Sequence, residues 1–177
     1  MTFLLSIDPG VRGVGAALFR GALLVGAGYV KNSAREGVGP GECAAVAVEV
    51  VAWVRRLKGD SCVDQLVLEW PQMYSGRAAR GDGSSLLSLA AVDGAIAASF
   101  RAPTRHVVPH GWKGNVPKPD GAKSEYIIRS RVMDRLSEDE RRHVVWPESA
   151  KFGWDVADAI GVGLWALGRF ERKRGNL

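Results

Sequence analysis

The chain has 177 residues, of which 46% are hydrophobic and 24% charged, and its formal net charge is +5. These values suit one domain, residues 1–177, with one sizeable core, and no apolar run approaches the roughly 20 residues that span a bilayer. The two cysteines lack a metal-ligand spacing, which argues against a disulfide framework. The basic balance weakly favours a polyanionic partner such as nucleic acid. Because Asp8 interrupts the apolar N-terminus too early for a secretory signal, we expect a cytoplasmic protein with no membrane partner.

The first half of the chain predicts three strands, a helix and a fourth strand. In chain order these segments are residues 2–7, 14–19, 22–30, 42–57 and 63–68. Arg20-Gly21 fits a two-residue hairpin between the second and third strands, so the chain is expected to open as a meander. Gly59 is predicted to end the helix, and Glu69 stands at the C-terminal end of the fourth strand.

The second half predicts a long loop, a helix, a strand and two more helices. In chain order the segments are a loop at 70–83, a helix at 86–100, a strand at 104–108, a basic loop at 110–121, a helix at 122–136, a charged stretch at 137–142, a helix at 154–170 and a basic tail at 171–177. Small residues at Ala90, Gly94 and Ala97/Ala98 form a stripe on the first of these helices. The stripe fits either packing on the sheet or close approach of a second helix across a dimer axis. The element order predicts an α/β or α+β domain built on one mixed sheet.

Carboxylates occupy four special places in this arrangement. Asp8 ends the first strand and Glu69 ends the fourth, while Asp155 and Asp158 lie three residues apart on one face of the last helix. Apolar residues continue that face, so we expect it to pack against the sheet, where carboxylates are costly unless a cation compensates them. Mg²⁺ prefers carboxylate oxygens, and two such ions can hold a phosphodiester and activate water.

Each carboxylate also has a simpler explanation when it is considered alone. Asp8 before Pro-Gly fits a turn residue, Glu69 fits an exposed strand end, and Asp155 fits a helix-start residue that interacts with the helix dipole. Asp158 is harder to explain in this way because its neighbours are apolar. The order of a strand-end Asp, a strand-end Glu and a helical Asp-x-x-Asp is far more restrictive than any single member.

Three segments resemble the motifs of RuvC-type Holliday junction resolvases, namely residues 6–10 (SIDPG), 66–69 (LVLE) and 155–161 (DVADAIG). This resemblance implies a ribonuclease H-like α/β fold, with a five-stranded mixed sheet flanked by helices. It also implies a homodimer that uses two Mg²⁺ ions per active site, replaceable by Mn²⁺, to resolve four-way DNA junctions by paired symmetric nicks. The implied catalytic carboxylates and metal ligands are Asp8, Glu69, Asp155 and Asp158.

The resemblance further places lysines near the scissile phosphate and the DNA backbone. Lys113 and Lys123 match these positions and are predicted to be catalytic and DNA-binding. For Lys118, DNA binding and a solvated basic loop are equally supported. Residues 112–114 and 116–118 look like those of phage-encoded members, so a phage-infected bacterial cell is one expected setting.

Further cations and an aromatic residue lie in the loop at 70–83. Tyr74, Arg77 and Arg80 are predicted to contact phosphates or unstacked bases of DNA, the alternative being cations that only keep the loop soluble. The basic residues from Arg169 to the C-terminus are interpreted as a solvated helix end and not as a specific site.

Other functions stay open on the sequence alone. The same fold can serve a nuclease for RNA–DNA hybrids or a broader debranching nuclease, and a protein can bind junctions without cutting them, although four clustered carboxylates disfavour metal-free binding of anionic DNA. An actin-like or sugar-kinase-like nucleotide binder needs two such domains, for which 177 residues leave no room. Trp70 and Trp112 flank the proposed functional loops and are the two tryptophans to test for base stacking, since most tryptophans belong to cores.

Overall fold

The protein is built on one five-stranded sheet. The computed structural model describes residues 1–34, 39–60, 62–71, 83–114 and 124–170. The strands are β1 Phe3–Asp8, β2 Gly13–Arg20, β3 Leu23–Lys31, β4 Gln65–Glu69 and β5 Thr104–Val107. Their order in the sheet is β3-β2-β1-β4-β5. The β1–β2 and β2–β3 pairs are antiparallel, whereas β4 pairs with β1 and β5 in parallel, so the predicted mixed sheet is confirmed.

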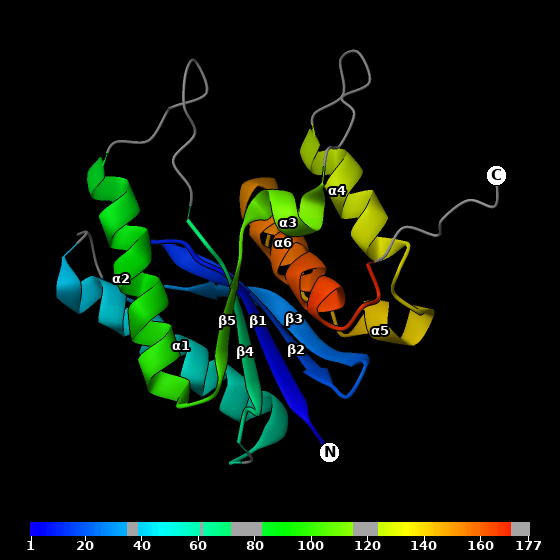
Figure 1. Cartoon of the computed structure of the whole chain (residues 1–177), viewed down its shortest axis with the longest axis horizontal. Coiled ribbons are helices and arrows are strands. Elements are labelled where there is room, and N and C mark those ends of the chain that lie inside the picture. The colour runs from blue at the N-terminus through cyan, green and yellow to red at the C-terminus, as the bar shows by residue number, and fades with distance from the viewer. Residues whose placement is uncertain (35–38, 61, 72–82, 115–123, 171–177) are drawn as a thin grey trace.

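Helices cover both faces of this sheet (Figure 1). In the described part of the chain they are α1 Pro40–Lys58, α2 Gly83–Phe100, α3 Pro109–Lys113, α4 Ser124–Met133, α5 Glu138–Arg142 and α6 Ala150–Ala166. On one face Val50 of α1 and Ile96 of α2 join a core cluster with Leu5, and on the other face Ile160 of α6 joins a cluster with Leu4. Leu4 and Leu5 face opposite sides because side chains alternate along a strand. None of these described helices is long and apolar enough to cross a bilayer.

Helix α6 approaches the sheet unusually closely because small residues face one another. A β-carbon at Gly15 would overlap the backbone carbonyl of Asp155, and one at Gly163 would lie 2.6 Å from Ser6 Oγ. The Ser6 hydroxyl donates a 2.8 Å hydrogen bond to the carbonyl of Ala159, which ties β1 to the middle of α6. Larger side chains at these positions would push α6, and the carboxylates it carries, away from the sheet.

Two short helices were not predicted from the sequence. The basic loop expected at 110–121 begins instead with α3, where Pro109 starts the helix and Gly114, at φ 62°, ends it. The charged stretch at 137–142 forms α5, whose start is fixed by a capping box between Ser137 and Glu140. The last helix also spans Ala150–Ala166 and not 154–170, because Ser149 precedes its first turn and Leu167 follows its last.

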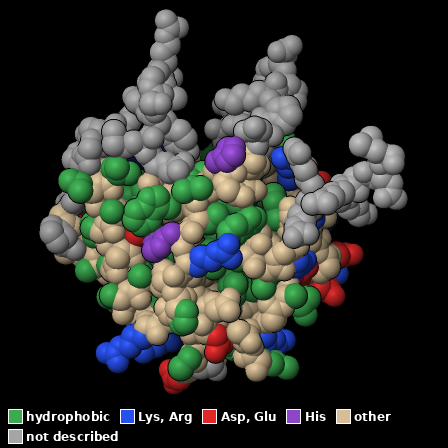
Figure 2. Space-filling view, viewed as in Figure 1, with side chains coloured by type: hydrophobic (Ala, Val, Ile, Leu, Met, Phe, Trp, Pro, Cys, Tyr) green, Lys and Arg blue, Asp and Glu red, His purple; other side chains and the backbone are tan. Residues whose placement is uncertain are grey.

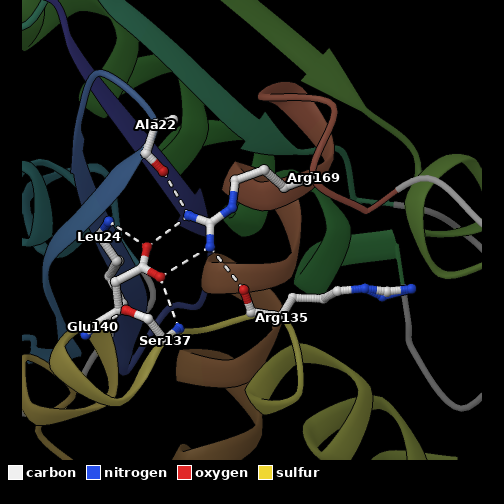
Figure 3. A network of polar contacts seen from close by, with 6 residues as sticks. All are labelled: Ala22, Leu24, Arg135, Ser137, Glu140 and Arg169. Atoms are coloured by element: carbon white, nitrogen blue, oxygen red, sulfur yellow. Dashed lines mark hydrogen bonds and ion pairs between the residues drawn. The ribbon is translucent and has the colours of Figure 1, made fainter.

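The end of α6 is anchored by a buried ion pair, which Figure 3 shows in close view. Glu140 of α5 is 4% exposed, and its two oxygens accept hydrogen bonds from Arg169 Nη1 at 2.6 Å and Nη2 at 2.9 Å. Arg169 also donates to the carbonyls of Ala22, at 2.5 Å, and Arg135, at 2.7 Å. The interpretation of Arg169 as part of a solvated helix end is therefore wrong, since it connects α5, α6 and the β2–β3 hairpin.

Candidate active site

The two strand-end carboxylates lie on neighbouring parallel strands. Asp8 ends β1 and Glu69 ends β4, and Ile7 pairs directly with Leu68 in the ladder between them. Ser6 bonds to α6, so the alternation of side chains along β1 places Asp8 on the α6 side of the sheet as well. Glu69 is only 8% exposed and Asp8 is half-buried in paired strand, so the simpler explanations as an exposed strand end and a turn residue fail.

The two helical carboxylates lie over this edge of the sheet on α6. Asp155 and Asp158 sit in the second and third turns, because the helix starts at Ala150. The first turn of α6 contains no acidic residue, so the interpretation of Asp155 as a helix-start residue is wrong. The close approach of α6 at Gly15, which touches the backbone of Asp155, brings this part of the helix onto the strands.

Lys113 joins the strand and helix carboxylates. Its ammonium Nζ lies 2.6 Å from Asp158 Oδ2 and 3.3 Å from Glu69 Oε1, with the lysine side chain only 19% exposed. Burial alone would lower the pKa of Lys113, but the attraction of Asp158 and Glu69 outweighs it and raises the pKa above its ordinary value. The amine therefore stays protonated at neutral pH and supplies one positive charge inside an acidic cluster.

Trp112 holds the other oxygen of Glu69. Its indole Nε1–H donates a 2.5 Å hydrogen bond to Glu69 Oε2, and the side chain is 3% exposed. The ring packs directly on α6 at Gly161, where a β-carbon would overlap it. Sequence reasoning selected Trp112 as a candidate for base stacking but did not find this role, because the bond depends on α3, a helix of five residues that has no periodic pattern.

The three aspartates of the cluster resist ionisation. Burial raises the pKa of Asp8 well above its ordinary value, and the negative charges of the other three carboxylates raise it further. Burial also raises the pKa of Asp158 to about 7, against the opposing attraction of Lys113, and that of Asp155 to about 6. Such a cluster favours any cation that compensates its charge.

This donor set has the chemistry of a hard-cation site, since carboxylate oxygens are the ligands that Mg²⁺ prefers. In the described part of the chain, however, no three Asp, Glu, His or Cys side chains are gathered as a ready-made metal-binding group. Lys113 instead bridges Glu69 and Asp158. The residues present thus fit a divalent cation by charge and ligand type, while the ligand geometry stays a prediction.

The other predicted DNA-binding residues lie outside the described residues. They are Tyr74, Arg77, Arg80, Lys118 and Lys123. Of the predicted cations, Lys113 alone falls within the described ranges, and it is in direct contact with two of the four carboxylates. The roles of the remaining five residues stay predictions.

The arrangement of elements is similar to that of two solved structures of RuvC. No family model matches the sequence, and no curated protein matches it. RuvC of Thermus thermophilus in complex with a Holliday junction substrate has a TM-score of 0.58 and 17% identity, over 95% of this chain and 94% of that one. A second structure of Thermus thermophilus RuvC has a TM-score of 0.50 and 17% identity, over 95% of this chain and 98% of that one.

At this level of identity the similarity establishes the fold. The chain has the fold of RuvC, an α/β fold on a five-stranded mixed sheet flanked by helices, as the sequence motifs predicted. The similarity extends over nearly the whole length of both chains.

Proposed function

We propose that the protein is a metal-dependent endonuclease that resolves four-way DNA junctions by paired nicks. The observation that carries this proposal is the convergence of Glu69, Asp158 and Lys113 beside Asp8, at one edge of a RuvC-like sheet. The fold alone does not carry it, because one fold hosts many activities. A buried acidic cluster with raised pKa values costs stability, and a catalytic role explains why it is kept.

Each residue has a proposed role. Asp8, Glu69, Asp155 and Asp158 would hold the metal, and bound Mg²⁺ would supply an activated water and stabilise the leaving oxygen. Trp112 fixes the orientation of the Glu69 carboxylate through the indole hydrogen bond. Lys113 keeps a positive charge at the site, which suits stabilisation of charge that develops on the scissile phosphate.

We also propose that the enzyme is a homodimer that associates through α2. Ala90, Gly94 and Ala98 are exposed on this helix, and Leu87 is 73% exposed. These three residues of the stripe therefore do not pack on the sheet, whereas Ala97 is partly buried and packs against the core cluster that holds Val92 and Ile96. An exposed apolar helix face favours a second copy of the chain, and a two-fold dimer would match the symmetry of a four-way junction.

The test is cleavage of end-labelled substrates by the purified protein. A mobile four-way junction, a three-way junction, a flap, an RNA–DNA hybrid and linear duplex would be incubated with Mg²⁺, with Mn²⁺ or with EDTA. We expect symmetric nicks in the four-way junction that need the metal and are lost in Asp158→Asn. The control is Asp60→Asn, which removes an exposed carboxylate in the turn after α1 and should cut like the parent.

Each other result changes the proposal in a defined way. Equal cutting of several branched substrates would replace junction resolution by general debranching, and cutting of the hybrid alone would indicate an RNA–DNA nuclease. Tight binding to the junction without cutting under either metal would overturn the enzymatic proposal. Undiminished cutting by Asp158→Asn would overturn the assignment of that carboxylate.

A further inference from the structure

A pocket lies beside α3, and apart from Trp112 and Lys113 none of its described lining residues has a role in the proposed cleavage chemistry. It has a volume of about 470 Å³ and is formed by α3, the end of α4 with the turn after it, and the end of α6 with the residues that follow it. This volume is within the range of pockets that bind small organic ligands, about 300–1,000 Å³. Figure 2 views the face that carries these helices, where cationic and hydrophobic side chains lie next to each other near the centre.

Among the described residues that line the pocket, the charged side chains are cationic. They are Arg131, Arg135 and Lys113, with His110 beside them, and none of the described lining residues is a carboxylate. Lys113 is already paired with carboxylates of the candidate active site. Arg131 and Arg135, in contrast, form no ion pair with any carboxylate in the described part of the chain. Two uncompensated guanidinium groups that line one pocket are suited to an anion such as a phosphate.

Figure 3 shows why Arg135 is available for such a ligand. Its backbone carbonyl accepts a hydrogen bond from Arg169, whereas its side chain extends away from the Glu140–Arg169 network. The guanidinium lies 5.7 Å from the centre of the Phe170 ring. The carbonyl of Arg135 thus contributes to the Glu140–Arg169 network, while its side chain lines the pocket.

The remaining wall of the pocket is aromatic. Trp165 and Phe170 line it, and Phe170 packs edge-on against Trp112 with ring centres 5.7 Å apart. Trp165 is half-buried and carries the guanidinium of Arg105 at 4.3 Å from its ring centre. Flat aromatic faces next to guanidinium groups that form no ion pair in the described part of the chain match a ligand that combines a planar ring with a negative charge.

We propose that this pocket binds one nucleotide unit, with the base against Trp165 and Phe170 and the phosphate at Arg131 and Arg135. Such a unit can be part of a DNA strand or a free mononucleotide. Recognition through ring faces and phosphate contacts alone predicts little preference among the four bases.

The position of the pocket connects it with the candidate active site. Asp158 and Trp165 are seven residues apart on the same side of α6, which corresponds to about 10 Å along the helix. Stacked DNA rises about 3.4 Å per nucleotide along one strand, so the pocket lies about three nucleotides from the phosphate that the carboxylates would hold. Trp112 and Lys113 contact both places. The pocket itself is inferred from its lining, and only its use by substrate DNA rests on the proposed function.

The first arm of the test uses 5′-dAMP, with deoxyadenosine and inorganic phosphate as half-ligands. Binding is followed through the indole N–H signals in NMR spectra, where Trp165→Phe identifies the signal of Trp165. We expect dAMP to shift this signal at concentrations at which neither half-ligand does. In Arg131→Gln/Arg135→Gln the affinity should fall about tenfold or more, because two charge-assisted contacts are lost.

The matched control is Arg55→Gln/Arg56→Gln. It removes the same charge from exposed positions on α1, across the sheet from α6. Thermal melting of both double variants checks that they fold. If Arg131→Gln/Arg135→Gln does not fold, the single variants Arg131→Gln and Arg135→Gln are compared with the control instead. Equal affinity for dAMP in the pocket variant and the control, with no effect in the DNA arm, would overturn the proposal.

The second arm measures binding of a four-way junction in EDTA by the same variants. A loss of about tenfold in the pocket variant relative to the control, without dAMP binding, would assign the pocket to a nucleotide of DNA. Binding of dAMP without any change in junction affinity would assign it to a free nucleotide. If the parent neither binds nor cuts branched DNA, the proposed function fails, and the dAMP arm still decides the pocket.

Discussion

Replacement of Glu140 by Gln tests whether the buried ion pair at the end of α6 stabilises the fold. Glu140 Oε1 accepts hydrogen bonds from Leu24 N and Arg169, and Oε2 accepts from Ser137 N and Arg169. Burial alone would raise the pKa of Glu140, but these hydrogen bonds outweigh it and lower the pKa from 4.5 to about 2. The folded state therefore stabilises the ionised form of Glu140 more than the unfolded state does.

The magnitude follows from this shift. A fall from 4.5 to about 2 corresponds to about 3 kcal/mol of folding free energy at about 1.4 kcal/mol per pKa unit. Because the folded pKa is lowered, this stabilisation is present above pH 4.5 and is lost as the pH falls from 4.5 towards 2. Glu140→Gln should thus lower the free energy of unfolding by about 3 kcal/mol at pH 7, or Tm by about 6–12 °C. The difference from the parent should shrink as the pH falls below 4.5.

Urea unfolding followed by circular dichroism at pH 7, 5 and 3 measures this difference. Glu138→Gln is the matched control, because Glu138 lies on the same helix and pairs with Arg142 at 2.9 Å, yet the two side chains are 84% and 69% exposed. Exposed pairs of this kind contribute little, so the control should unfold close to the parent. Equal losses in the two variants at pH 7, or a Glu140→Gln loss that stays constant down to pH 3, would refute the reasoning.

Three further predictions concern the interior. Burial raises the pKa of Asp93 to about 7, so Asp93→Asn should stabilise the protein above pH 7 by up to about 4 kcal/mol. This gain in stability should disappear as the pH falls towards 4, and thermal melting at pH 8.5 and pH 4 measures it. Gly161→Ala should displace the Trp112 ring, which should lower the free energy of unfolding by about 1–3 kcal/mol and slow junction cutting. Gly41→Ala is the control, because a β-carbon at Gly41 meets nothing, and it should change neither the stability nor the cutting. Asp155→Asn should raise Tm of the EDTA-treated protein at pH 8, because burial raises the pKa of Asp155 to about 6. The same variant should lose the cutting activity. A lower Tm than that of the parent would contradict the first effect.

The sequence was sufficient for those parts of the site that depend on regular strands. Asp8 and Glu69 follow apolar runs, and parallel neighbours bring their C-terminal ends to one edge of the sheet. Asp155 and Asp158 follow from helical spacing. Their places were predictable because each depends only on local periodicity and on the rules of strand pairing.

The contacts that organise these carboxylates could not be predicted in the same way. The hydrogen bond from Trp112 to Glu69 joins residues 43 positions apart through a helix too short to show a period. The Glu140–Arg169 pair joins residues 29 positions apart. The sequence contains a signal for Glu140 alone, because Ser137 and Glu140 have the spacing of a capping box. Tertiary packing decides which buried partner a charged side chain meets, and single-sequence patterns contain no information about it.

Tight packing of α6 explains how the fold tolerates its repulsive centre. Asp158 reaches Lys113 only if α6 lies close to the sheet and α3 lies close to α6. The first condition depends on Gly15 and Gly163, and the second depends on Gly161, since a β-carbon at any of these positions would meet another part of the chain. The same glycines therefore allow the core to pack and force the carboxylates together. Substitutions that relieve the repulsion should stabilise the protein and impair its chemistry, as is expected where a functional site is maintained at the expense of stability.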